Sequence, residues 1–394
     1  MNNLVDFKFI EDYDVNKIEQ AFKDAISKLD FAKNFKEGLN VVLNVSMPTK
    51  ADKNTAICTH PAVVEAIVNV LAEYKVNCTL TGSPYGKFNL TNLNNVYFAS
   101  GMLDVANKTS LELDVSLKTT EIAVPNGVKC KSFTILEAIE NADLLINIGK
   151  VKFDNRLGYL GVSTNLFGAV PGELKNTYLN RLSTQQDFYN LAIDINMELA
   201  KKPILNVLDG IVVRETSGNP RMLSAFITGT NMYSTDAFLL NLLNIDYINT
   251  IIKVANDRGF VNYSTPFKQT GDSISSINES SILPHELNLD TLINVNNFST
   301  RSYFNKHQQL PTINPDECKG CTVCSKICPT GAILMKYDKN GELYAHIDYK
   351  KCVYCKKCVT ACPYRVVKVK TPPAHKKLTK TMDKFNNTKN IEEE

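Results

Sequence analysis

A doubled run of cysteines is the feature of this sequence that most limits its fold. Eight of the eleven cysteines lie between Cys318 and Cys362. The run Cys-x2-Cys-x2-Cys-x3-Cys-Pro begins at Cys318 and begins again 34 residues later, at Cys352. Three thiolates spaced in this way can wrap a loop around one face of an iron–sulfur cubane. Zinc sites favour separated Cys-x2-Cys pairs or Cys-x2-Cys with histidine, and neither run contains a histidine, so the pattern predicts iron–sulfur ligands.

The cysteine-rich segment resembles the bacterial two-cluster ferredoxin domain over residues 312–370. The resemblance implies that the fourth cysteine of each run ligates the cluster of the other run. One [4Fe–4S] cluster is then expected on Cys318, Cys321, Cys324 and Cys362. The second is expected on Cys352, Cys355, Cys358 and Cys328. Between the two runs, alternating residues flank Asn340-Gly341 and predict a β-hairpin with a tight turn.

The chain before the cysteines alternates between strand and helix patterns. Strands are expected at 39–46, 76–82, 111–116, 143–149, 203–213 and 223–231. Helices are expected at 61–74, 95–106, 132–142, 187–200, 234–244 and 246–258. This alternation predicts an α/β fold with a mostly parallel wound sheet. The predicted domains are an α/β domain at 1–265, a polar linker at 266–311, a small α+β two-cluster ferredoxin module at 312–370 and a frayed tail at 371–394.

Six motifs in the first domain occur in a characteristic order. They read CTHPAVVEAIVNVL, TLTGSPYG, DLLINIGKVKFD, TNLFGAVPG, NVLDGIV and YSTDAFLL. As a set they resemble the domain-of-unknown-function 362 family, whose members often carry a C-terminal two-cluster ferredoxin. The resemblance covers residues 38–260, with Thr164 standing where the family usually has a lysine before NLFG. It implies an architecture and gives no reaction.

Polar residues follow several of the predicted strands. In wound α/β sheets, ligands bind at the carboxyl ends of the strands. Small residues after a strand often only make a turn, and lysines usually lie in water, so the set is more informative than any one member. We expect it to line one pocket that opens toward a cluster, with lysines suited to a carboxylate or phosphate group. The catalytic candidates are His60, Lys150, Lys152 and Asp209, and the candidates for binding a substrate or organic cofactor are Gly82, Ser83 and Asn165.

Three residues in this domain each leave two roles open. His60 precedes Pro61 at a predicted helix start, where it either contacts an anion or acts as an acid or base, or it caps the helix. The segment TNLFGAVPGELK is expected to be a surface loop, in which Asn165 either meets a substrate or fixes the loop. Asp236 is expected to place its charge at the start of its own helix.

Charge and hydropathy exclude several classes of protein. The net charge of +3 gives no reason to expect nucleic-acid binding. The longest apolar runs, such as AFLLNLLNI, are too short for a membrane span. The N-terminus has no basic flank before an apolar stretch, so we expect a cytoplasmic protein. Oxygen-sensitive clusters and a composition rich in Asn, Lys and Ile favour an anaerobic bacterium.

The functional hypothesis is an oxidoreductase that transfers electrons through two [4Fe–4S] clusters to or from a substrate or cofactor held by the α/β domain. No flavin or nicotinamide motif is evident, so any organic cofactor stays unknown. A redox partner protein is expected, and a small-molecule substrate is possible. One alternative is a non-catalytic electron carrier or docking subunit of a larger redox enzyme. Another is a non-redox α/β enzyme with structural clusters.

Overall fold

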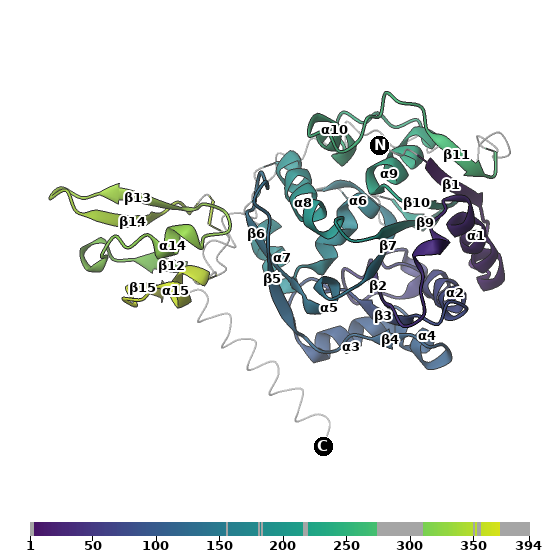
Figure 1. Ribbon diagram of the computed structural model, residues 1–394, viewed down its shortest axis with the longest axis horizontal. Coiled ribbons are helices and arrows are strands. Elements are labelled where there is room, and N and C mark those ends of the chain that lie inside the picture. The colour runs from purple at the N-terminus through teal and green to yellow at the C-terminus, as the bar shows by residue number, and fades with distance from the viewer. Residues whose placement is uncertain are drawn as a thin grey trace, which may run out of the picture. The chain divides into compact units, whose positions relative to one another are not determined.

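The polypeptide forms two units in a computed structural model (Figure 1). The first unit comprises residues 1–175 and 184–295, and the second comprises 176–183 and 296–394. Within these ranges the structure describes residues 4–154, 157–179, 182, 184–215, 220–273, 310–349, 351–352 and 356–370. The predicted tail at 371–394 and the ligand candidate Cys355 lie outside the described residues.

A nine-stranded sheet organises the first unit. Its order is β11 (Lys268–Gly271), β1 (Leu4–Phe9), β10 (Pro220–Gly229), β9 (Ile204–Arg214), β7 (Leu144–Asp154), β2 (Asn40–Val45), β3 (Asn77–Thr81) and β4 (Glu112–Leu113), and β8 (Gly158–Leu160) pairs with β7. The strands from β9 to β4 pair in parallel, whereas β10 is antiparallel to both of its neighbours. The predicted α/β class with a mostly parallel sheet is therefore confirmed.

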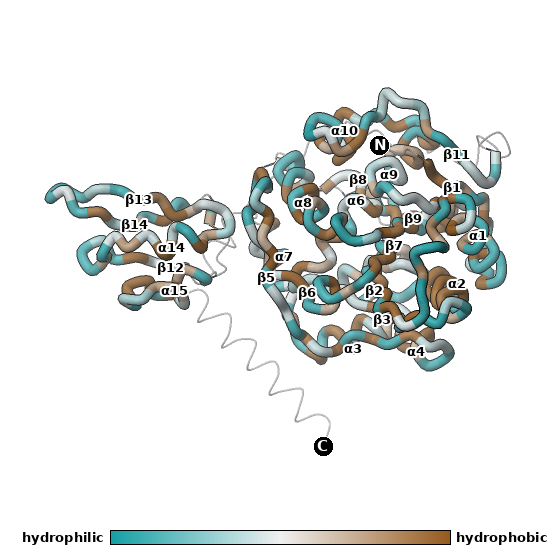
Figure 2. The backbone as a smooth tube through the Cα atoms, viewed as in Figure 1, coloured by the Kyte–Doolittle hydropathy of each residue, from teal (hydrophilic) through white to brown (hydrophobic). Residues whose placement is uncertain are grey.

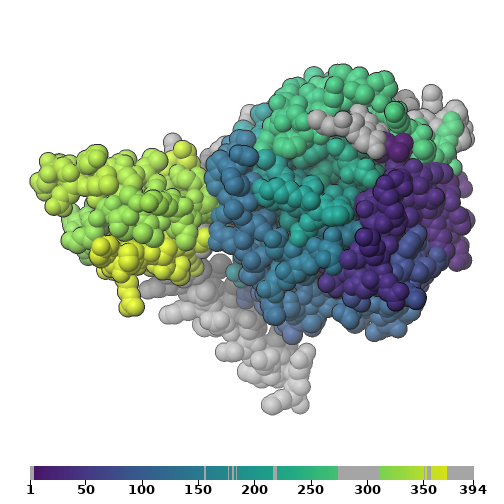
Figure 3. Space-filling model, in the orientation of Figure 1, coloured from purple at the N-terminus to yellow at the C-terminus, as the bar shows by residue number. Residues whose placement is uncertain are grey.

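Helices cover this sheet. They are α1 (Val15–Lys28), α2 (Pro61–Ala72), α3 (Leu90–Ala99), α4 (Met102–Lys108), α5 (Glu137–Glu140), α6 (Val162–Asn165), α7 (Gly172–Leu179), α8 (Gln185–Leu199), α9 (Met232–Leu242) and α10 (Ile251–Asp257). The tube of α2 is brown along most of its length in Figure 2, and nine of its residues are buried. A helix that is apolar on most sides belongs in a core. In Figure 3 the purple N-terminal atoms lie beside the green atoms near β11, because β1 and β11 are paired.

Two predicted helices differ in the structure. Residues 132–142 form strand β6 (Ser132–Leu136), paired with β5 (Thr119–Ala123), and then the short α5. The reason is the period of two in SFTIL, in which Phe133 and Ile135 are both fully buried. The helix predicted at 95–106 is divided into α3 and α4 at Gly101, whose φ of 79° ends one helix and starts the next.

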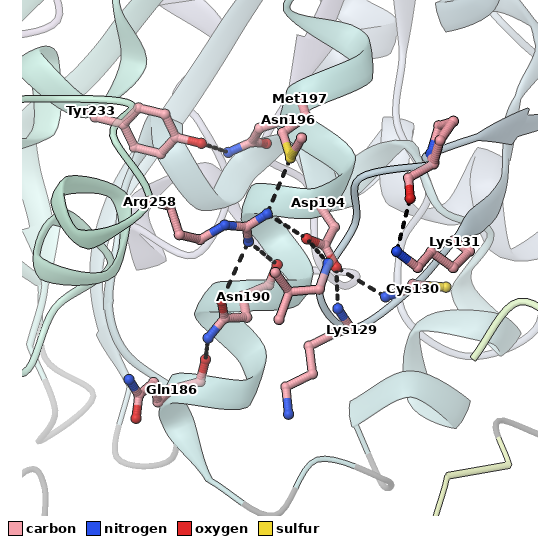
Figure 4. Close-up of polar contacts among 12 residues, drawn as sticks. Lys129, Cys130, Lys131, Gln186, Asn190, Asp194, Asn196, Met197, Tyr233 and Arg258 are labelled. Atoms are coloured by element: carbon pink, nitrogen blue, oxygen red, sulfur yellow. Dashed lines mark hydrogen bonds and ion pairs between the residues drawn. The ribbon is translucent and has the colours of Figure 1, made fainter. Parts of the chain in front are cut away.

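A buried carboxylate on α8 fixes the turn that leads into β6 (Figure 4). Asp194 accepts hydrogen bonds from the backbone N–H groups of Val128, at 2.8 Å, Cys130, at 2.9 Å, and Lys129. The guanidinium of Arg258 pairs with the same carboxylate at 2.8 Å. Since the carboxylate is fully buried, these donors replace the water that it loses on folding.

The second unit contains two small antiparallel sheets and two short helices. Strand β12 (Leu310–Ile313) pairs with β15 (Val367–Lys370), and β13 (Ile333–Tyr337) pairs with β14 (Leu343–Ile347). Helices α14 (Val323–Lys326) and α15 (Lys357–Ala361) lie between the strands in sequence. The predicted hairpin is confirmed, with Gly341 at a φ of 79° in its turn.

The sequence repeat of the second unit is matched by a repeat in its backbone conformation. Thr322 and Lys356, which are 34 residues apart, both adopt left-handed φ values, 65° and 61°, and each caps a short helix. Gly331 and Arg365, at the same spacing, have φ values of 59° and 55°. Because a non-glycine residue seldom adopts this conformation, the described parts of the two cysteine runs share these two backbone turns.

The bounds of the predicted linker change at its start. Lys268–Gly271 form β11 and pair with β1, so this part of the predicted linker belongs to the sheet. Residues 274–309 of the predicted linker lie outside the described residues.

No helix in the described ranges is both long and apolar enough to cross a bilayer.

Candidate functional site

Four cysteines from both runs surround one hollow in the second unit. Three of its thiols come from the first cysteine loop, and the fourth comes from the end of the second run. They are Cys318, Cys321, Cys324 and Cys362. This set has the same members as the first predicted ligand set.

A second hollow repeats the arrangement. Cys352 and Cys358 of the second run line it together with Cys328, the last cysteine of the first run. The remaining predicted member, Cys355, lies outside the described residues. The two short helices α14 and α15 and the turns after each run bring these cysteines together.

Backbone N–H groups face several of the sulfur atoms. Ala345 donates to Sγ of Cys318 at 3.4 Å, and Ala332 donates to Sγ of Cys328 at 3.2 Å. Burial raises the pKa of Cys362, but hydrogen bonds from the backbone of residues 364–367 outweigh it and bring the pKa below its ordinary value. Such donors stabilise thiolate sulfur, which is the form that ligates metal.

The described thiol groups around the two hollows form a donor set of sulfur alone. Such a donor set suits iron–sulfur clusters.

In the first unit, three catalytic candidates meet in a buried network. Nζ of Lys150 in β7 pairs with Asp209 in β9 at 2.9 Å, and the two side chains are 1% and 0% exposed. The same ammonium donates to the hydroxyl of Tyr13 at 2.7 Å, and Tyr13 donates to Asp209 at 3.0 Å. Burial lowers the pKa of Lys150 against the opposing effect of Asp209. The pair is in register across adjacent strands, which explains how residues so far apart in sequence meet.

His60, the third member, caps α2. The ring Nδ1 of His60 accepts from the backbone N–H of Ala62 at 3.2 Å, and the ring stacks on Tyr13 with centroids 3.6 Å apart. The backbone N–H of His60 donates to the carboxylate of Asp209 at 3.0 Å. The capping role left open in the sequence is therefore present. Burial lowers the pKa of His60 to about 4.

This pKa predicts an acid-sensitive contribution to stability. The folded state binds fewer protons at His60 than the unfolded state between pH values of about 6.5 and 4, so the contribution is full above this window and is lost as the pH falls through it. The variant His60→Asn keeps a capping oxygen and does not titrate. We expect its free energy of unfolding to fall less steeply over this window, measured by urea unfolding at several pH values. Parallel pH profiles for the two proteins would contradict the assignment.

The other candidates lie at the ends of neighbouring strands. Nζ of Lys152 donates to Oγ of Ser46 at 2.8 Å and to the carbonyl oxygen of Ile57 at 3.2 Å. Ser83 accepts from the backbone N–H of Gly172 at 2.8 Å, so it joins the end of β3 to the start of α7. Gly82 is tightly packed, since a Cβ there would lie 3.1 Å from the carbonyl oxygen of Val45.

Asn165 belongs to a buried amide ladder. Its Nδ2 donates to the side-chain oxygen of Asn147 at 2.9 Å, and Asn147 donates to Asn206 at 3.0 Å across β7 and β9. The segment TNLFGAVPGELK is thus no surface loop: it runs from the end of α6 through a short helical turn at Leu166–Ala169 to the start of α7, and Leu166 and Phe167 are buried. The prediction failed because the segment's apolar side chains pack on the sheet while its amides pair with the ladder.

Asp236 also acts outside its own helix. It accepts from the hydroxyl of Tyr159 at 2.8 Å and from the backbone N–H groups of Val162 and Ser163 at 3.0 and 2.8 Å, so it caps α6 instead of α9. Burial raises its pKa to about 6 despite these donors. The hydroxyl of Thr164, in the same helix, donates to the carbonyl oxygen of Gly161 at 3.1 Å and accepts from the N–H of Gly161 at 3.3 Å.

Comparison with known families identifies the family of each unit. Residues 41–241, about half of the chain, match the family described as domain of unknown function DUF362. The chain belongs to the DUF362 family. Residues 317–366 match the 4Fe–4S dicluster domain, so the second unit of this DUF362 protein is an iron–sulfur domain of ferredoxin type.

Two of the relatives match a short part of this chain, and a third matches most of it. A probable iron–sulfur protein of the Frd operon of Proteus vulgaris, named as a subunit, is 43% identical over 56 residues, which are 14% of this chain and 32% of that protein. The arsenate respiratory reductase iron–sulfur subunit of Shewanella sp. is 38% identical over 74 residues, 18% of this chain and 28% of that one. A thylakoid-associated protein of Synechocystis sp. is 23% identical over 256 residues, 63% of this chain and 77% of its own. The matches to the first two span about a third of those proteins or less.

A solved structure with a weak overall likeness to the DUF362 protein is the lactate racemase apoprotein of Thermoanaerobacterium thermosaccharolyticum. It is 16% identical, with a TM-score of 0.26, over 58% of this chain and 54% of that chain. A likeness of this size carries no argument about fold or reaction.

The three cysteines within the DUF362 unit are buried and lie outside the two hollows. Burial raises the pKa of Cys58, and that of Cys78 to about 12, so these thiols stay neutral and make poor ligands. We expect the variant with Cys58, Cys78 and Cys130 all replaced by alanine to keep its full iron content, measured after anaerobic purification. Cys324→Ala is the matched control and should lose iron, whereas loss of iron from the triple variant would reveal a missed ligand.

Sequence reasoning missed Tyr13 and Lys175 in the DUF362 unit. Tyr13 precedes α1 and lies 196 residues from Asp209 in sequence. Lys175 is buried in α7, and its ammonium donates to the carbonyl oxygen of Ser83. Neither belongs to a motif with fixed spacing. The proline and glycine just before Lys175 were the only local signal of a helix start at that point.

Proposed function

We propose that this DUF362 protein is a ferredoxin-type oxidoreductase that holds two [4Fe–4S] clusters. Electrons would pass to or from a small-molecule substrate or cofactor held by the α/β unit. The observation that carries the proposal is the pair of hollows, each lined by cysteines from both runs. A cytoplasmic location is part of the proposal, since reduced thiols persist there.

In this proposal the eight cysteines divide between two clusters. Cys318, Cys321, Cys324 and Cys362 would hold one cluster, and Cys328, Cys352, Cys355 and Cys358 the other. A bound [4Fe–4S] cluster with four thiolate ligands supplies one-electron transfer and keeps no open coordination position. The chain contributes backbone N–H donors to the ligating sulfurs, and these donors tune the reduction potential.

The α/β unit is proposed to hold the substrate near the ends of β2, β3 and β7. Lys152 with Ser46, and Lys175 with Ser83, bring polar groups from different strands to this region. The buried Lys150–Asp209 pair and Tyr13 hold β7 and β9 in place beside it. Fusion to this unit keeps an electron donor at high effective concentration.

One experiment distinguishes this proposal from the alternative, a docking subunit. The Proteus and Shewanella proteins are named as subunits, which favours that alternative. Anaerobic protein is reduced with dithionite, freed of excess reductant and mixed with a small-molecule extract or a protein fraction of the native cells. We expect the small-molecule extract to reoxidise the protein, with ferricyanide as the positive control. Reoxidation by the protein fraction alone would replace the proposal with the docking role.

A further inference from the structure

Two lysine ammonium groups in the α/β unit lack a carboxylate partner. Lys152 donates to the hydroxyl of Ser46 and the carbonyl oxygen of Ile57, and Lys175 donates to the carbonyl oxygen of Ser83. Within the described part of the chain, no ion pair within 4.0 Å includes either lysine. The nearby Lys150, by contrast, has Asp209 at 2.9 Å. Lys175 is only 3% exposed, and a lysine so deeply buried is usually paired.

Hydrogen-bond capacity is also left over at these two groups. An ammonium carries three N–H donors. The described contacts occupy two donors of Lys152 and one of Lys175. The face of the Tyr85 ring, 5.5 Å from Nζ of Lys175, adds attraction for a cation but accepts no charge-assisted hydrogen bond. Donors therefore remain on both lysines for an acceptor from outside the protein.

The two charges also act on each other. Burial, together with the charge of Lys152, lowers the pKa of Lys175 to about 7. Burial lowers the pKa of Lys152 to about 8; Lys150 acts in the same direction, and Cys58, Asp154 and Asp209 oppose it. The strand ends that carry their partners are adjacent: Ser46 follows β2, Ser83 follows β3, and the two strands pair in parallel, with a Cβ at Gly82 only 3.1 Å from the carbonyl oxygen of Val45. Two positive charges held at adjacent strand ends in a low-dielectric site favour an anion beside them.

We propose that Lys152 and Lys175 bind one oxyanion group, a carboxylate or a phosphate, of the small molecule that the α/β unit holds. Ammonium groups act on such ligands as point charges. The hydroxyl of Ser46 lies beside Lys152, and the carbonyl oxygen of Ser83 lies beside Lys175. The ends of β2, β3 and β7 come together here, where wound sheets bind ligands. This inference names the substrate class of the proposed function and rests on that function for its purpose, but anion binding itself is measurable without electron transfer.

The test uses the full chain, without reductant, and three probes at equal ionic strength: phosphate, acetate and chloride. We expect phosphate or acetate to bind and to raise the thermal midpoint by about 2 °C or more, with chloride as the blank. Phosphate and acetate distinguish the two oxyanion types. The variants Lys152→Met and Lys175→Met keep the aliphatic stem and should each weaken binding about tenfold or more.

Lys202→Met is the matched control, because the ammonium of Lys202 also donates to backbone carbonyl oxygens, those of Glu140 and Ala142. It should bind the probe as the parent protein does. Equal binding by the parent and Lys175→Met, or binding of neither oxyanion, would overturn the inference.

If a variant fails to fold, proton uptake by the parent protein tests the lysine contacts instead. An anion beside these lysines raises their pKa values, so the parent protein should take up protons on binding at a pH of about 8. Calorimetry in two buffers of different ionisation enthalpy measures this uptake, and binding without uptake would contradict the lysine contacts. Intact binding without electron transfer would overturn the proposed function alone, and electron transfer without oxyanion binding would overturn this inference alone.

Discussion

Replacement of Cys362 by serine should remove about half of the iron from the protein, because one of two clusters loses a ligand. The diagnostic results come from double variants. Cys318 and Cys362 line the same hollow, so Cys318→Ser with Cys362→Ser should still leave about half of the iron. Cys352 lines the other hollow, so Cys352→Ser with Cys362→Ser should remove nearly all of it.

The same double variants test the opposite assignment. If each run held its own cluster, Cys352 and Cys362 would share one, and their double variant would keep half of the iron. The pair from different runs, Cys318 and Cys362, would then lose all of it. Iron and sulfide assays on anaerobic samples give the answer, and Cys78→Ser serves as the control that should keep full iron.

A second large effect is expected at the buried ion pair of the α/β unit. Asp209→Asn preserves volume but leaves the ammonium of Lys150 buried without a countercharge. We expect a loss of about 3–5 kcal/mol in the free energy of unfolding, measured by urea unfolding followed by circular dichroism. The hydroxyl of Tyr13 offers Lys150 an acceptor but no charge.

The partly exposed pair between Lys8 and Asp24 provides the control. Its side chains are 20% and 30% exposed, so Asp24→Asn should cost less than about 1 kcal/mol. Adding Lys150→Met to Asp209→Asn should recover most of the lost stability, because the unpaired charge is gone. A cost for Asp209→Asn no larger than that of Asp24→Asn would contradict a buried, uncompensated lysine.

Local patterns predicted part of the structure well. The cysteine spacing, the hairpin at Asn340-Gly341 and the strand that became β2 depend on residues close in sequence, so a sequence pattern can reveal them. The segment at 132–142 was assigned to a helix because its apolar residues fit more than one period. Residues 132–136 form a strand because they pair with β5, and this pairing is a tertiary contact that the local pattern does not show.

The candidate site was predicted only in part for the same reason. Lys150 and Asp209 were singled out because Lys150 follows one predicted strand and Asp209 interrupts another, and the structure pairs the two residues across β7 and β9. Tyr13 and Lys175 were missed because their partners, Asp209 and Ser83, lie 196 and 92 residues away, and no motif links them. The sequence around Asp236 predicted a charge at the start of its own helix, whereas its hydrogen-bond donors come from residues 159–163.

The central claim is that the second unit binds two [4Fe–4S] clusters, each able to accept one electron. An anaerobic reductive titration, followed by electron paramagnetic resonance with iron and sulfide assays on the same sample, tests it most directly. The account predicts about eight iron, about eight sulfide and two electrons taken up per chain. A sample with about two zinc ions and little iron, or one electron with about four iron, would contradict it.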